Sequence, residues 1–194
     1  TNKEISVLFR IREPEVYNIF ITWVRFMALQ WREIDIWPSR ELVNFYFPSD
    51  FKAKFPQTRV VFDGAEIPVK KPSNPVAQQS TFSTYKNKNT AKTLIGVTPG
   101  GMVSYISDCY GGSTSDRQIV ERNPIRVQAQ DSIMADKGFD VQDLFAPKDV
   151  TVNIPAFFKK QNKIKGYVAK RDRKISSKKF MLNALLEQLK LTRF

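Results

Sequence analysis

Short, mostly apolar segments separated by turn residues occupy the middle of the chain. Four of them are residues 60–63, 92–97, 102–107 and 132–135. Three end at or just before an acid, and residues 92–97 are followed by Thr-Pro-Gly-Gly. This pattern is typical of buried strands. The Thr-Pro-Gly-Gly sequence at residues 98–101 predicts a hairpin turn. We therefore expect the first three strands to be antiparallel and the fourth to return beside the first after a helix.

Helical periodicity marks the beginning and the end of the chain. Pro14 opens a predicted helix over residues 15–30, whose apolar face we expect to lie in a core or on a partner. That face consists of Val16, Ile19, Phe20, Trp23, Val24 and Met27. Near the end, residues 176–191 predict a second amphipathic helix.

Shorter elements lie between these helices. Ser39 and Ser115 are candidate N-caps of short helices, the second over residues 116–122. Residues 139–144 predict the start of another helix and residues 150–154 a short strand. Residues 48–56 are predicted to be a linker that contains one helical turn. Residues 68–75, which contain Lys70 and Lys71, are predicted to form an exposed loop.

This pattern predicts two parts of the chain and an α/β fold. Residues 1–57 are expected to form a helical N-terminal segment, and residues 58–194 a mixed sheet flanked by helices. No apolar run is long enough for a membrane span, because residues 17–29 are too few and Arg25 interrupts them. We expect no signal peptide and no membrane association.

Composition restricts the chemistry that is available. The 194 residues include no histidine and one cysteine, Cys109. This excludes histidine-dependent nucleophiles and an internal disulfide, and it fits a reducing compartment. Catalysis would therefore depend on carboxylates, lysines or a bound metal ion.

Positive charge is concentrated at the end of the chain. Residues 157–194 hold twelve lysines and arginines against two acids, a net charge of +10, and the other 156 residues hold only +2. This distribution favours a polyanion such as DNA as partner; a solvated basic face is the alternative. The candidate DNA-binding residues are Lys159, Lys160, Lys170, Arg171, Arg173 and Lys174.

Two acids stand at the ends of predicted strands. Asp63 follows Val60-Val61-Phe62 and Asp136 follows a second apolar run, and each has a glycine within two positions. Because they are 73 positions apart, only the fold can make them neighbours; the predicted strand order brings both to one edge of the sheet. Asp63-Gly64 is also a common turn pair. Asp116 fits the first turn of its helix as well as it fits a metal site.

Seven segments keep the order found in one family. They are WPSR (37–40), FDGAEI (62–67), YKNKNTAK (85–92), GVTPGG (96–101), YGGSTSD (110–116), ADKGF (135–139) and NIP (153–155). In these segments the chain resembles the DDE nuclease domain of Harbinger-like transposases and their domesticated relatives. The resemblance implies an RNase H-like fold, in which three antiparallel strands are followed by parallel ones, and DNA cleavage with Mg²⁺ or Mn²⁺.

The resemblance also implies the site residues. Asp63 and Asp136 match the first two acids of the catalytic triad and would hold the metal ions. The position of the third acid, normally a glutamate on the last helix, falls on Asn183. Glu187, one helical turn further on, is the alternative third acid. Glu66 and Asp116 are expected to support the site or the fold.

Two functions remain open from the sequence. The first is a metal-dependent DDE endonuclease with a degraded third acid. The second is a catalytically inactive, domesticated transposase domain that binds DNA or a protein. The helix-turn-helix unit that usually precedes the nuclease domain of the family lacks its middle here, so we expect a partner protein to supply DNA recognition. The expected location is the nucleus, with the cytoplasm as the alternative.

Overall fold

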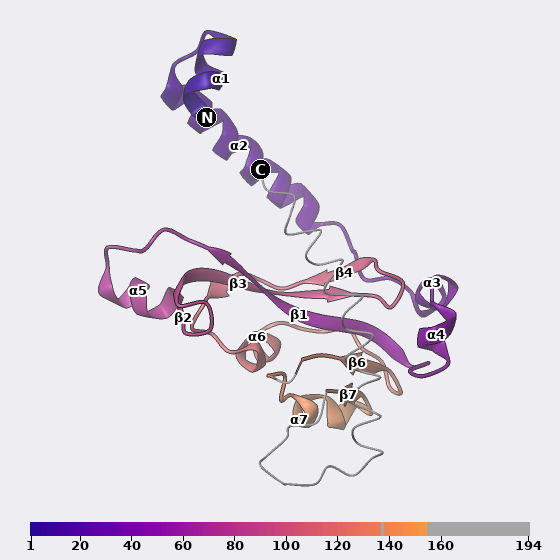
Figure 1. Ribbon diagram of the computed structural model, residues 1–194. Helices are drawn as coiled ribbons and strands as arrows, with labels where there is room; N and C mark the ends of the chain where they lie inside the picture. Colours follow the sequence, from indigo (N-terminus) through magenta and orange to yellow (C-terminus); the bar gives the residue numbers. More distant parts are fainter. Residues whose placement is uncertain (137, 155–194) are drawn as a thin grey trace. The chain divides into compact units, whose positions relative to one another are not determined.

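The computed structural model describes residues 1–136 and 138–154, which form two units described separately below. The first unit, Thr1–Ile36, contains α1 (Asn2–Phe9) and α2 (Glu13–Arg32) (Figure 1). Thr1 caps α1 in a capping box with Glu4. Arg10, at φ 55°, ends α1 in the left-handed conformation and allows the chain to turn into α2.

The predicted helix over residues 15–30 is confirmed within the longer α2. Val16 is the buried residue of this helix. Further along the predicted apolar face, Ile19, Phe20, Trp23 and Val24 are exposed among the residues that the structure describes. Most of this face therefore does not lie in a core formed by the described residues, and the alternative that it packs on a partner stays a prediction.

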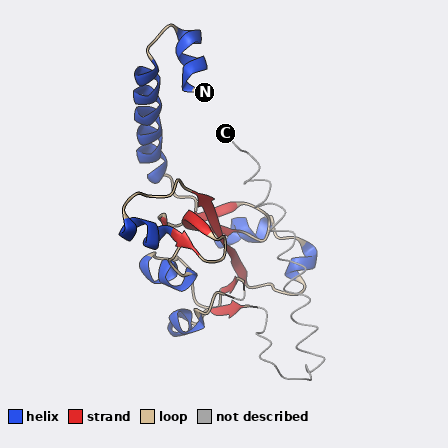
Figure 2. Ribbon diagram, turned by 60° about the vertical axis from the view of Figure 1, so that its left-hand side comes forward, coloured by secondary structure: helices blue, strands red, loops and turns tan. Residues whose placement is uncertain are grey.

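The second unit begins at Trp37 and is built on a mixed sheet (Figures 1 and 2). Its two long strands, β1 (Thr58–Pro68) and β3 (Lys88–Val97), pair antiparallel from Val61–Val97 to Pro68–Thr90. Three short strands share the other edge of β3: β2 (Phe82–Ser83), β5 (Tyr110–Gly111) and β4 (Val103–Ile106). The predicted hairpin turn joins β3 to β4, and Gly101 takes φ 92° there.

On the edge away from β3, β1 pairs with a parallel strand. β6 (Ser132–Met134) lies beside β1, and β7 (Thr151–Asn153) lies beside β6. The order β4-β3-β1-β6-β7, with three antiparallel strands followed by two parallel ones, is that of an RNase H-like fold. The predicted fold and the four predicted strands are therefore confirmed.

Helices cover both faces of this sheet. α6 (Asp116–Arg122) and α7 (Gln142–Phe145), which continues as a 3₁₀ turn over Ala146–Lys148, supply one apolar cluster around Phe62, Leu94 and Ile133. α3 (Arg40–Phe45) and α4 (Ser49–Lys52) supply the second cluster, around Val61, Val97 and Met134. The N-caps predicted at Ser39 and Ser115 are both present.

Two features of this unit were not predicted. The segment 48–56 does contain a helical turn, but Phe51 is buried against the sheet, so the segment is part of the core rather than a linker. α5 (Pro75–Thr81) follows an exposed loop and is capped by the Asn74 side chain. α5 buries none of its residues. Its sequence therefore needs no apolar face, and the periodicity by which a helix is predicted is absent.

Candidate active site

Asp63 lies inside β1 and not at its end. The strand continues through Gly64 to Pro68, and each of these residues pairs with β3 without a bulge. The predicted strand end at Asp63 is therefore wrong, and so is the alternative of an Asp-Gly turn. What ends near Asp63 is the pairing on the other edge of β1, because β6 stops at Met134, opposite Val61.

The register of β1 and β6 relates the two predicted acids. Val61 is opposite Met134 in the parallel pair, so Asp63 and Asp136 lie the same two residues beyond it. Because side chains alternate along strands, Asp63 projects from the face of β1 that carries Val61, and the same alternation would give Asp136 the face of Met134. Neighbouring strands are about 4.8 Å apart. The register thus places these two acids at equivalent positions just beyond the β1–β6 pairing, although they are 73 positions apart in sequence.

Both acids line one cavity of about 730 Å³ at this edge of the sheet. Asp63 is partly exposed and Asp136 is exposed, so both carboxylates can be reached from solvent. Glu66 and Asp116 add two further acids to the wall, and Lys86, Lys88 and Lys92 add three cations. The cavity therefore combines four acids with three lysines in its lining.

Aromatic packing fixes the backbone on which the two acids are carried. Phe62 precedes Asp63, and Phe139 follows Asp136 after a turn in which the Phe139 amide donates to the Asp136 carbonyl. The two rings are stacked, with centroids 6.0 Å apart and planes 11° apart, and both are fully buried. Tyr105 packs edge-on to Phe62, and burial raises the pKa of its phenol to about 12. The Tyr105 phenol therefore stays protonated, and the three packed rings carry no charge at neutral pH.

An ion pair between Lys92 and Asp116 lines the same cavity as the two stacked rings. The Lys92 ammonium is 2.8 Å from Asp116 Oδ1 and donates to the Thr114 carbonyl at 3.2 Å. A Cβ atom added to Gly64 would be 3.2 Å from the same Oδ1, which places this carboxylate against the β1 backbone. Gly64 alternates with Asp63, so Asp116 packs on the opposite face of β1 from the Asp63 side chain.

Glu66 is also held by a local partner. Its carboxylate accepts a hydrogen bond of 3.0 Å from the Thr90 hydroxyl, on the strand paired with its own. Together with the Lys92–Asp116 ion pair, this contact supports the expectation that Glu66 and Asp116 stabilise the surroundings of the site. No sequence pattern indicates the Lys92–Asp116 pair, because its members are 24 positions apart on a strand and a helix.

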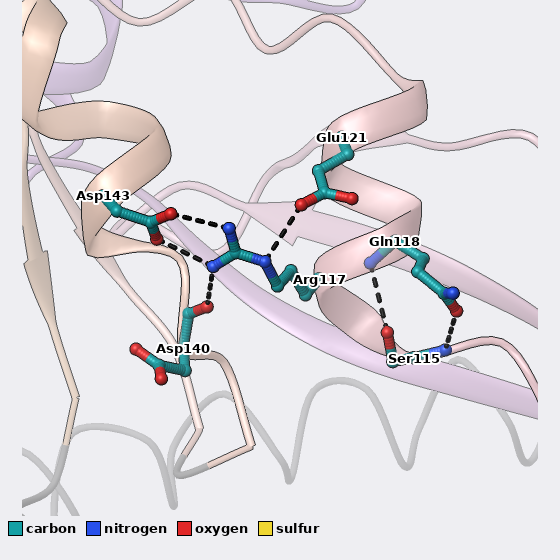
Figure 3. A network of polar contacts seen from close by, with 6 residues as sticks. All are labelled: Ser115, Arg117, Gln118, Glu121, Asp140 and Asp143. Atoms are coloured by element: carbon teal, nitrogen blue, oxygen red, sulfur yellow. Dashed lines mark hydrogen bonds and ion pairs between the residues drawn. The ribbon is translucent and has the colours of Figure 1, made fainter.

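Arg117 ties α6 to the segment that follows Asp136 (Figure 3). Its guanidinium donates to the Asp143 carboxylate at 2.6 and 2.7 Å, and to the Asp140 carbonyl at 2.9 Å. It also donates to Glu121 on its own helix at 2.9 Å. The hydrogen bonds from Arg117 hold the pKa of Asp143 below its ordinary value. This bidentate pair anchors the chain a few residues beyond the second acid.

The residues present suit a hard divalent cation in chemistry but supply only part of a ligand set. Mg²⁺ and Mn²⁺ prefer oxygen ligands, which Asp63 and Asp136 offer. Within residues 1–136 and 138–154, no three acidic, histidine or cysteine side chains gather closely enough to hold a metal ion. The predicted third position, Asn183, and its alternative, Glu187, lie outside the described residues. So do the six basic residues Lys159, Lys160, Lys170, Arg171, Arg173 and Lys174.

The strand order is that of an RNase H-like fold, and comparison with known families agrees with it. The family model of the DDE superfamily endonucleases matches residues 62–193, about two thirds of the chain. The chain therefore belongs to this family. Neither the comparison with curated proteins nor that with solved structures gave a match. In the described part of the chain, none of the helices combines the length and apolar character needed to cross a membrane.

Proposed function

We propose that the chain is a metal-dependent endonuclease that cuts DNA phosphodiesters, derived from a transposase and weakened at its third acid. The observation that carries this proposal is that Asp63 and Asp136 each lie two residues beyond the last pair of β1 and β6, Val61–Met134, and that both line one cavity. Membership of the DDE superfamily endonucleases supports DNA as the substrate.

In this proposal each residue of the site has a distinct task. Asp63 and Asp136 hold divalent cations, which, when bound, activate water and stabilise the leaving oxygen. The stacked Phe62 and Phe139 hold the backbone segments that carry the two acids side by side. Arg117 anchors the segment after Asp136, and the Lys92–Asp116 pair supports the opposite face of β1. None of these supports requires a histidine.

Metal binding gives a direct test. Because the two placed acids carry two negative charges, we expect Mn²⁺ to bind weakly and Mg²⁺ more weakly, since Mg²⁺ demands stricter geometry. Calorimetric titration with Mn²⁺ should show a loss of about 100-fold or more in Asp63→Asn and in Asp136→Asn, because loss of even an outer-shell partner costs about 10–100-fold. Asp108→Asn, an exposed acid outside the cavity, is the matched control. Wild-type affinity in Asp63→Asn would contradict the proposal.

We also propose that residues 157–174, which we call the basic tail, supply most of the DNA affinity. Replacing Lys159, Lys160, Lys170, Arg171, Arg173 and Lys174 with glutamine should flatten the salt dependence of binding, by about 0.9 log-log units for each phosphate that is no longer neutralised. The measurement is the DNA dissociation constant over a series of salt concentrations. If the slope of the salt dependence is unchanged, the main DNA-binding surface must lie in another part of the chain.

A second candidate function is a DNA- or protein-binding module without nuclease activity. Asn183, at the position where the family has a glutamate, favours it. It predicts that DNA binding persists while nicking and specific Mn²⁺ binding are both absent. Under either function we propose a nuclear location, where the DNA substrate lies, and a partner protein that contributes DNA recognition.

A further inference from the structure

The far end of the β1–β3 ribbon carries lysines without acids to balance them. Residues 67–107 contain five lysines, no arginine and no acid. One of the five, Lys92, is already paired with Asp116. The other four, Lys70, Lys71, Lys86 and Lys88, are all exposed. In the part of the chain that the structure describes, none of these four forms an ion pair. We call them the ribbon lysines.

The fold gathers the ribbon lysines at one place. The pairing of β1 with β3 continues past Pro68–Thr90, because the Val69 amide donates to the Asn89 carbonyl at 3.0 Å. The next residues along the two chains are Lys70 and Lys88. Like charges facing each other across strands are destabilising. A bound anion that contacts several of the ammonium groups would offset the repulsion between them.

The backbone that presents these lysines is well held. Ser83, which is buried, accepts a hydrogen bond of 3.2 Å from the Lys86 amide. Asn89, also buried, donates to the Gln78 carbonyl and to the Thr81 hydroxyl, both at 2.8 Å. The Lys86 ammonium lies 5.0 Å from the centre of the Tyr85 ring, in a cation–π contact. The backbone positions of Lys86 and Lys88 are therefore well defined by contacts within the chain.

The same cavity connects this surface to the paired acids. Tyr85, Lys86 and Lys88 line it together with Asp63 and Asp136. In the β1–β3 register Asp63 is opposite Ile95, seven residues from Lys88 along β3. At about 3.4 Å per residue this is at most roughly 24 Å. B-DNA rises about 3.4 Å per base pair, so the span corresponds to roughly seven base pairs.

We propose that the ribbon lysines form a second DNA contact, which binds the phosphate backbone of the flank on one side of the cutting site. This inference rests on the proposed nuclease function for its choice of DNA. It differs from the proposed basic tail in position, because it lies on the sheet that carries Asp63. The observations that carry it are the four exposed lysines and the cavity that two of them, Lys86 and Lys88, share with the two acids.

The test compares two variants of the full chain that remove the same number of charges. In the first, Lys70, Lys71, Lys86 and Lys88 are replaced by glutamine. In the control, Lys3, Lys52, Lys54 and Lys148, which are exposed elsewhere, are replaced by glutamine. Binding to a duplex of about 30 base pairs is measured over a salt series without metal. At about 0.9 log-log units per neutralised phosphate, the slope of the ribbon variant should fall by up to about 3.6 units, and the control should retain the wild-type slope.

The outcomes separate this inference from the proposed function. Equal slopes in the ribbon variant and the wild type, or equal decreases in the two variants, would overturn the second contact. An unchanged thermal unfolding midpoint in the ribbon variant shows that a lower slope is not caused by misfolding. Failure of the nuclease proposal would appear differently, as absent nicking and absent specific Mn²⁺ binding while the slope difference between the variants persists.

Discussion

Replacing Asp63 with asparagine is expected to abolish Mn²⁺-dependent nicking of supercoiled DNA, with a fall of at least about 10³-fold. The substitution keeps the shape of the side chain and removes one of two charges that would hold the cation. Metal ions supply several kilocalories per mole of transition-state stabilisation, and each tenfold in rate needs about 1.36 kcal/mol. The measurement is the conversion of supercoiled to open circular plasmid over time.

Controls distinguish this effect from damage to the fold. Asp63 is partly exposed at the open edge of β1, so Asp63→Asn should keep the wild-type unfolding midpoint. Asp108→Asn should nick as the wild type does. Asp136→Asn should lose activity to a similar extent, and the double variant should lose little more, since residues that act as a unit are not additive. Nicking that survives in Asp63→Asn would place the active site elsewhere.

Local sequence patterns predicted most of the sheet but not the length of its central strand. The hairpin turn at residues 98–101 and the cap at Ser115 depend on a few neighbouring residues, and both are confirmed. The extension of β1 from Gly64 to Pro68 depends on pairing with residues 90–94. The local pattern of Asp63-Gly64 favours a turn, and only the distant partner strand overrides it.

The site shows the same division between local and distant information. The related positions of Asp63 and Asp136 could be predicted because strand order, once inferred, places β1 beside β6, and each acid follows the apolar run of its strand. Lys92 and Asp116 could not be paired from sequence, because nothing in the sequence distinguishes them from any other strand lysine and any other acid in the first turn of a helix. The ribbon lysines are marked in the sequence by a stretch of 41 residues without an acid. That these lysines share one end of the β1–β3 ribbon could be inferred only from the register of the two strands.

A carboxylate at position 183 is expected to strengthen the site, because of the charge that the cations meet there. If Asn183 occupies the third position, Asp63 and Asp136 supply only two negative charges, and Asn183→Glu should raise Mn²⁺-dependent nicking by about tenfold or more. A gain of that size needs only about 1.4 kcal/mol. Asn183→Gln, which has the length of glutamate without its charge, is the matched control and should give no gain.

Glu187→Gln separates the two candidates for the third position. One turn of helix is about 5.4 Å, which is long compared with a coordination bond, so Glu187 reaches the site only if the helix is shifted from the family's register. With Asn183 at the third position, the loss of Glu187 leaves nicking unchanged and the gain in Asn183→Glu persists. Loss of nicking in Glu187→Gln would instead identify Glu187 as the third acid. Fast Mg²⁺-dependent nicking by the wild type that Glu187→Gln leaves intact would contradict the weakened site altogether, because two carboxylates would then suffice for a rate that normally requires three.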